Sequence, residues 1–110
     1  MDLVLRLIKA ADLRSRVLAA NLANQNTPAY TRRVVSFEDS LRDVLQSGGD
    51  ISKVKPTIGL DAEAPSRPDG NNVSLELEMN AMRENRILYD TYIAMLQGHF
   101  SLLEHAITGN

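Results

Sequence analysis

The sequence is poor in several residue types that other protein classes depend on. It contains no cysteine and no tryptophan, and aromatic residues make up only 5% of its 110 positions. Without cysteine the chain has no disulfides, thiolate metal sites or cysteine nucleophiles. No stretch approaches the roughly 18 apolar residues of a membrane-spanning helix, and Asp2, Arg6 and Lys9 interrupt any signal-peptide core. We therefore expect neither a transmembrane segment nor a cleaved signal peptide, and aliphatic helix packing in place of a large globular core.

Polar residues form no recognisable catalytic or metal-binding pattern. His99 and His105 are too far apart around a helix to share a metal ion, and Glu76 and Glu78 face away from each other. The net charge of −2 and a single Arg32–Arg33 pair give no footprint for nucleic acid. The sequence therefore indicates a protein that is not an enzyme, with no cofactor, no metal ion, no nucleic acid and no small-molecule substrate.

The most regular pattern lies in the last third of the chain, where one position recurs in alternating steps of four and three. The positions are Leu75, Met79, Met82, Arg86, Tyr89, Ile93, Leu96, Phe100, Leu103 and Ile107. This seam, apolar except at Arg86, is typical of a helix packed along a partner helix, as in a coiled coil. It predicts a helix over 73–107, with Asn71–Asn72 at its N-cap. Arg86 either extends into solvent or pairs with a carboxylate on a neighbouring helix.

Apolar residues at helical spacing also predict a helix over residues 2–24. Its packing positions are Leu3, Leu7, Val17, Leu18 and Leu22. This segment has a net positive charge and 73–107 a net negative charge, which favours their association. At about 1.5 Å per residue the two helices are roughly 35 and 50 Å long, so the first cannot cover the second. The uncovered part of the seam is a predicted contact with another subunit.

The middle of the chain changes character twice. Residues 25–47 combine an Asn- and Pro-rich segment, a short extended piece at Tyr30–Val35 and a short helix over about 37–46, with Ser36 and Asp39 resembling a capping box. Residues 48–72 hold four of the six glycines and three of the four prolines, which is typical of a flexible linker. Ile51–Ile58 could form a short edge strand in it.

We therefore expect a single elongated all-α domain over 1–110. Its long N- and C-terminal helices would pair as an antiparallel or coiled-coil-like hairpin, with a short middle helix and an irregular or short-β linker between them.

Two segments resemble a known family. The sequence ANLANQNTPAYTRR at 20–33 resembles the N-terminal signature of bacterial flagellar rod, hook and hook-associated axial proteins. GNNVSLELEMNAMRENRILYD at 70–90 and HFSLLEHAITG at 99–109 resemble the C-terminal patterns of a proximal rod protein of that family. The resemblance assigns a structural role, shaping the bend after the first helix, to Asn21, Asn24, Asn26, Thr27, Pro28 and Tyr30. Ala29 stands where the family usually has glycine, which predicts a turn with no glycine-only conformation.

The resemblance implies a structural subunit of the proximal rod of the flagellar basal body. Such a subunit is exported by the flagellar type III apparatus without cleavage, assembles helically in the periplasm through its terminal helices, and helps to transmit motor torque. Implied partners are further copies of itself, the rod proteins FlgC and FlgF, FliE and the MS ring, and the export apparatus in transit. The alternatives are a subunit like the sibling rod protein FlgC, or a cytosolic helical adaptor or export chaperone.

Overall fold

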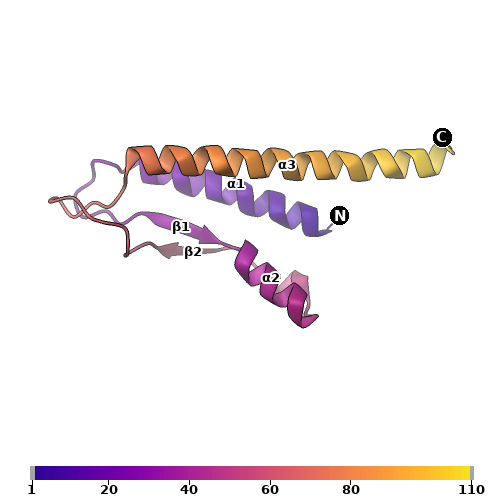
Figure 1. Cartoon of the computed structure of the whole chain (residues 1–110), viewed down its shortest axis with the longest axis horizontal. Coiled ribbons are helices and arrows are strands. Elements are labelled where there is room, and N and C mark those ends of the chain that lie inside the picture. Colours follow the sequence, from indigo (N-terminus) through magenta and orange to yellow (C-terminus); the bar gives the residue numbers. More distant parts are fainter. Residues whose placement is uncertain (1, 110) are drawn as a thin grey trace.

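Two long helices from the ends of the chain lie side by side in the computed structural model, which describes residues 2–109 (Figure 1). Helix α1 spans Asp2–Ala23 and helix α3 spans Leu75–Thr108, within a molecule of 64 × 29 × 14 Å. This confirms the predicted pairing of the terminal helices in a mainly helical fold. No helix within residues 2–109 combines the length and apolarity needed to cross a membrane.

The two helices run antiparallel, because contacts late in α1 meet the start of α3. The Asn21 side chain lies 3.3 Å from Glu78, whereas the Asn85 amide donates to the Ala11 carbonyl at 2.9 Å. The residues of α3 that are buried along this contact are Glu78, Asn85 and Tyr92. They recur every seven residues, and two of the three are polar.

The predicted seam therefore lies partly to one side of the stripe that contacts α1. Its members Met82, Tyr89, Ile93 and Leu96 are half-buried, while Leu75, Met79 and Arg86 are exposed. The buried stripe repeats every seven residues as the seam does, but it is centred one position earlier, on Glu78 and Asn85 in place of Met79 and Arg86. Arg86 is exposed and pairs with Asp90 on its own helix at 3.1 Å. Within this chain it therefore extends into solvent and does not pair with a carboxylate on a neighbouring helix.

A small sheet and a short helix lie on the other side of α1 from α3 (Figure 1). Strand β1 (Arg33–Ser36) pairs antiparallel with β2 (Thr57–Leu60). Between them come helix α2 (Glu38–Ser47) and a 3-10 turn, η1 (Ile51–Lys53). The strand predicted within Ile51–Ile58 is thus wrong at its start, because Ile51–Lys53 forms the 3-10 turn. Only Thr57 and Ile58 of that segment belong to a strand. The core cluster comprises Ala10, Phe37, Leu41 and Val54.

Two predicted helix caps are wrong. Ser36 is the last residue of β1, so Phe37 becomes the N-cap of α2, with no side-chain capping bond. Asp39 pairs with Arg42 at 2.6 Å instead. Helix α3 is capped not by Asn71–Asn72 but by Ser74, whose hydroxyl accepts from the Leu77 N–H at 3.3 Å.

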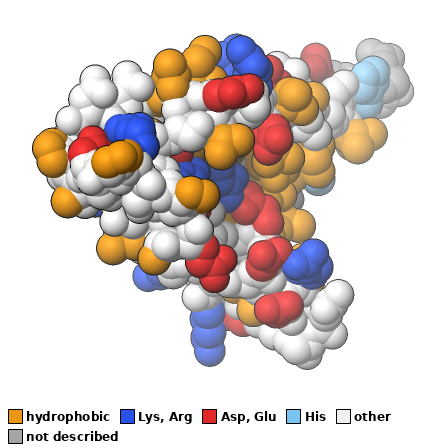
Figure 2. Space-filling model, turned by 60° about the vertical axis from the view of Figure 1, so that its left-hand side comes forward, with side chains coloured by type: hydrophobic (Ala, Val, Ile, Leu, Met, Phe, Trp, Pro, Cys, Tyr) orange, Lys and Arg blue, Asp and Glu red, His pale blue; other side chains and the backbone are white. Residues whose placement is uncertain are grey.

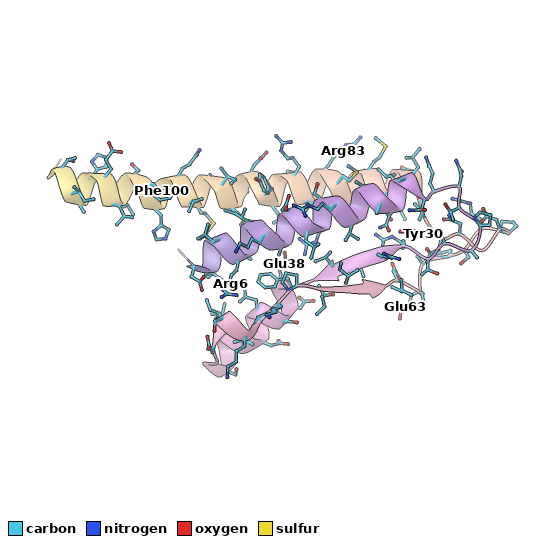
Figure 3. The ribbon with its side chains drawn as sticks, turned by 180° about the vertical axis from the view of Figure 1, so that it is seen from behind. Arg6, Tyr30, Glu38, Glu63, Arg83 and Phe100 are labelled. Carbon is cyan, nitrogen blue, oxygen red and sulfur yellow. The ribbon has the colours of Figure 1, made fainter. Side chains whose placement is uncertain are left out.

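Helix α3 extends well past the start of α1. Every residue from Gln97 to Gly109 is exposed, and Figure 3 shows Phe100 on this uncovered part. We call Gln97–Thr108 the overhang. The antiparallel register places it at the C-terminal end of α3.

Candidate functional site

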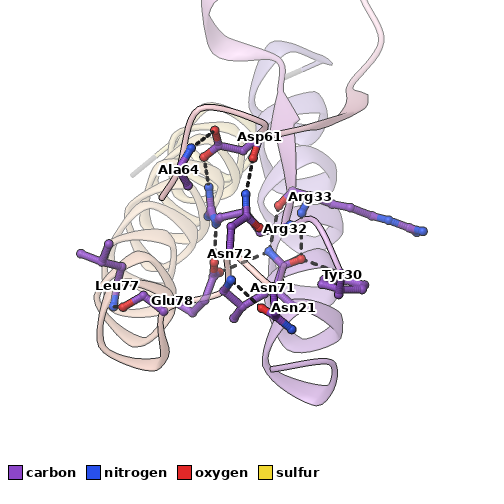
Figure 4. Close-up of polar contacts among 12 residues, drawn as sticks. Asn21, Tyr30, Arg32, Arg33, Asp61, Ala64, Asn71, Asn72, Leu77 and Glu78 are labelled. Atoms are coloured by element: carbon purple, nitrogen blue, oxygen red, sulfur yellow. Dashed lines mark hydrogen bonds and ion pairs between the residues drawn. The ribbon is translucent and has the colours of Figure 1, made fainter. Parts of the chain in front are cut away.

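The most densely bonded part of the molecule is the closed end of the helical hairpin, where the Asn-rich segment meets the GNNV segment (Figure 4). We call this region the junction. Asn21, fully buried at the end of α1, faces the outer edge of β1. Its amide nitrogen donates to the Arg33 carbonyl at 2.8 Å, and its amide oxygen accepts from the Arg33 N–H at 2.9 Å. The side chain thereby bonds β1 as a neighbouring strand would.

The Asn72 side chain also bonds backbone groups of the sheet, but it lies between the two chain segments that continue β1 and β2. Its amide oxygen accepts from the Arg32 N–H and its amide nitrogen donates to the Asp61 carbonyl, both at 2.6 Å. Arg32 and Asp61 are the pair that follows Arg33 and Leu60 in the register of β1 and β2. Asn72 therefore bridges the end of the ladder, where the two backbones separate, and ties the start of α3 to it.

Asn71 fastens the loop before α3 to the loop after α1. Its amide nitrogen donates to the carbonyls of Asn24 and Thr27, both at 2.8 Å, and its oxygen accepts from the Val73 N–H at 2.7 Å. Arg67 adds bonds to the carbonyls of Val73 and Gln25. Residues 61–72, expected as part of a flexible linker, are thus bonded along the junction.

The turn after Pro28 uses a left-handed backbone that alanine can adopt, so it needs no glycine-only conformation, as the prediction from Ala29 had it. Ala29 has a φ of 61°, and its N–H donates to the Asp69 carbonyl at 2.8 Å. Gly70, with a φ of 84°, lies against it: a Cβ on Gly70 would approach the Ala29 Cα to 3.2 Å. The loop bonds hold alanine in a conformation that costs an L-residue about 1–2 kcal/mol.

A chain of three charges crosses the junction. The Arg32 guanidinium bonds the fully buried Glu78 carboxylate at 2.5 Å and Asp61 at 2.7 Å. The bond to Glu78 is the main cause of a raised pKa for Arg32, and the bond from Arg32 lowers the pKa of Asp61. The other oxygen of Glu78 accepts from Asn21 at 3.3 Å. Both oxygens of the buried carboxylate are therefore satisfied.

A second polar cluster joins all three helices farther along the hairpin. Arg14 of α1 pairs with Glu38 of α2 at 2.5 Å and donates to the Asn85 amide oxygen of α3 at 3.2 Å. Tyr92 lies in the same part of the α1–α3 contact, where burial, and then the charge of Glu38, raise its pKa. One oxygen of Glu38 is buried without a hydrogen-bond partner within residues 2–109. This cluster fixes α2 to the helical pair.

The structure brings together some of the predicted site residues and separates others. Of the motif residues, Asn21, Asn24, Thr27 and Tyr30 share the junction bonds, and Tyr30 donates to Asn21 at 3.2 Å. Asn26 and Pro28 are exposed. In α1, Val17 and Leu18 are buried and Leu3, Leu7 and Leu22 half-buried; Leu103 and Ile107 lie on the exposed overhang.

Sequence reasoning missed Glu78, Asn85 and Asn72 as interior polar residues. A search for apolar periodicity passes over polar side chains by design. Glu78 and Asn85 stand seven residues apart, in step with Tyr92, and this spacing is the signal that could have found them.

Comparison with known proteins gives several relatives that share one description. No family model matches the chain. The flagellar basal body rod protein FlgB of Escherichia coli K12 is 32% identical over 104 residues, covering 77% of this chain and 75% of the relative. FlgB of Borrelia hermsii is 31% identical over 120 residues, covering 91% and 89%. FlgB of Bacillus subtilis 168 is 26% identical over 116 residues, covering 93% and 88%.

Proposed function

The chain belongs to the FlgB family of flagellar basal body rod proteins, and on that premise we propose that it joins the rod through the overhang of α3. It is a structural protein of the basal body rod, as the resemblance of its terminal segments predicted. The proposal concerns how it assembles. The terminal helices would make the contacts between subunits, and residues 1–110 would act as one elongated unit.

The observation that carries this proposal is the apolar surface of the overhang. Phe100, Leu103 and Ile107 continue the predicted seam and are all exposed, Ile107 to 83%. Figure 2 shows hydrophobic side chains gathered at this end of the molecule, beside a histidine. Earlier along the same seam, Met82, Tyr89, Ile93 and Leu96 are half-buried, so a helix from another subunit could continue the contact along the overhang.

Export without cleavage fits the packing of α1. Val4 is buried and Leu3 and Leu7 are half-buried, so residues close to the start of α1 contribute to the folded hairpin. Removal of a leader that included them would delete part of the contact with α3 and the core cluster. We include in the proposal the periplasmic location, a part in transmitting torque, and contacts with FlgC, FlgF, FliE, the MS ring and, in transit, the export apparatus.

Two adjacent leucines offer a matched test. Leu103 lies on the seam, whereas Leu102, exposed to 70%, points about 100° away around the helix. Each is changed to lysine and expressed in cells that lack the native gene, and basal bodies are then purified. We expect Leu102→Lys to restore motility and Leu103→Lys to be missing from basal bodies, because a buried subunit contact does not accept an unpaired charge. Normal incorporation of Leu103→Lys would refute a contact through this stripe.

A further inference from the structure

Strand β2 has an outer edge with open backbone groups. The Asp61 N–H bonds the Arg32 carbonyl at 2.9 Å, which makes Arg32 and Asp61 a hydrogen-bonded pair. Antiparallel pairs alternate, so Leu60 and Ile58, opposite Arg33 and Val35, point their N–H and C=O groups away from β1. Within residues 2–109 nothing covers this edge: all four residues of β2 are exposed, Ile58 to 52% and Leu60 to 67%.

The opposite edge of the sheet is closed. The outward groups of Arg33 in β1 are both bonded by the Asn21 side chain. A second copy therefore cannot place its β2 along β1 in a head-to-tail array, because α1 and Asn21 already occupy that position. Within residues 2–109, the outer edge of β2 therefore has more room for an added strand than that of β1.

The open edge is complementary to itself. If two copies of β2 meet antiparallel with Gly59 opposite Gly59, each Ile58 faces the other copy's Leu60, and all the outward N–H and C=O groups are paired. Gly59 has open space around its Cα, so two backbones can approach there. Exposed Lys55 precedes β2 and exposed Glu63 follows it, so the same twofold axis brings the basic end of each strand towards the acidic end of the other.

From this geometry we propose that β2 is a strand-addition site for a second copy of this chain, which pairs antiparallel across a twofold axis at Gly59. None of the four residues of β2 is charged or proline, the residues that commonly protect an edge strand. The contact is small, so the dimer is weak and forms at high local concentration. It extends the sheet from two strands to four.

If the protein assembles into the rod as proposed above, this dimer competes with that assembly. A twofold contact uses the same surface on both partners and closes, whereas a helical rod needs head-to-tail contacts that repeat. Given that function, paired copies cannot build the rod through β2. The dimer is then a competing state that restrains polymerisation of subunits that have not reached the rod.

The absence of cysteine permits a direct test with the full chain. Gly59→Cys places a thiol on the proposed axis, at a non-hydrogen-bonded pair whose Cα atoms lie about 4.5 Å apart, within disulfide range. Gln46→Cys is the control, an exposed position of α2 that belongs neither to β2 nor to the overhang. Both purified proteins are oxidised under the same conditions, and the initial rate of disulfide-linked dimer formation is measured on non-reducing gels.

We expect Gly59→Cys to form dimer at least about tenfold faster than Gln46→Cys. Adding Leu60→Lys should slow it about tenfold, because two apolar cross-strand pairs worth roughly 1.4 kcal/mol together are lost. Equal rates for the two cysteines would overturn the proposal. Faster linkage through Gln46→Cys would overturn it too. Cross-linking of Gly59→Cys in cells only to a different basal body protein would assign the edge to that partner instead.

Discussion

Replacement of the buried carboxylate at the junction should cost more stability than any other single change in α3. Glu78 is fully buried, and its two oxygens accept from Arg32 and Asn21. Loss of one member of a buried ion pair costs about 3–5 kcal/mol because the other charge stays behind. Arg32 retains Asp61 and some solvent contact, so we expect the lower end for Glu78→Ala, about 3 kcal/mol.

The measurement is urea unfolding followed by circular dichroism, at concentrations low enough to avoid self-association. Glu76→Ala is the matched control, because Glu76 lies in the same turn and is exposed. Its cost should stay within about 0.5 kcal/mol. In thermal scans, Glu78→Ala should lower the Tm by about 12 °C, at roughly 4 °C per kcal/mol for a chain of this size.

An isosteric change sharpens the test. Glu78→Gln retains the shape, but an amide has only one acceptor oxygen, whereas Arg32 and Asn21 both present donors. One contact then becomes donor against donor, so we expect Gln to recover less than half of the loss caused by Ala. If Ala and Gln at this position both cost as little as Glu76→Ala, the junction does not stabilise the hairpin in the way argued above.

Three further outcomes follow from the junction. Ala29→Gly should stabilise the protein by about 0.5–1 kcal/mol in urea unfolding, since relief of left-handed strain exceeds the added unfolded-state entropy; Gly70→Ala should destabilise it. The Arg32 guanidinium lowers the pKa of Asp61, so this carboxylate stabilises the fold above its unfolded pKa of about 3.9, and the contribution fades as the pH falls below that value. Between pH 2 and 6, the free energy of unfolding should therefore change less steeply with pH for Asp61→Asn than for the native chain. Asn21→Ala should cost about 3 kcal/mol by leaving several buried polar groups unpaired, against less than about 0.5 for the exposed Asn26→Ala; equal costs would contradict the role of Asn21 as a strand substitute.

The helices could be predicted from the sequence because their periodicity is a local property. The predicted first helix ends one residue from the observed end at Ala23, and the long C-terminal helix was expected over 73–107 and spans Leu75–Thr108. The contact stripe was harder to predict. It carries Glu78 and Asn85, whose side chains are polar, and burial of such groups depends on partners that lie 57 and 74 residues away along the chain.

The junction could be located from the sequence but not understood from it. The asparagines at 21, 71 and 72 read as a helix stop and a helix cap, which are local roles. In the structure Asn21 and Asn72 bond the backbone of the sheet, and the sheet itself pairs strands 21 or more residues apart. The left-handed Ala29 shows the same limit, since the bonds that stabilise it come from the loop at 69–70.

The unequal lengths of α1 and α3 have a kinetic consequence for building a polymer. Gln97–Thr108 continues a helix that is already nucleated but has no packing of its own, so we expect it to fray more readily than the rest of α3 until a neighbour covers it. On the assembly proposed above, a subunit that docked in the wrong register would gain less from this segment and would be released more readily. The junction, at the other end of the hairpin, keeps its shape throughout. On the assembly proposed above, each subunit would combine a densely bonded end with an exposed end that can sample positions, and this difference would favour subunits that dock in the correct register.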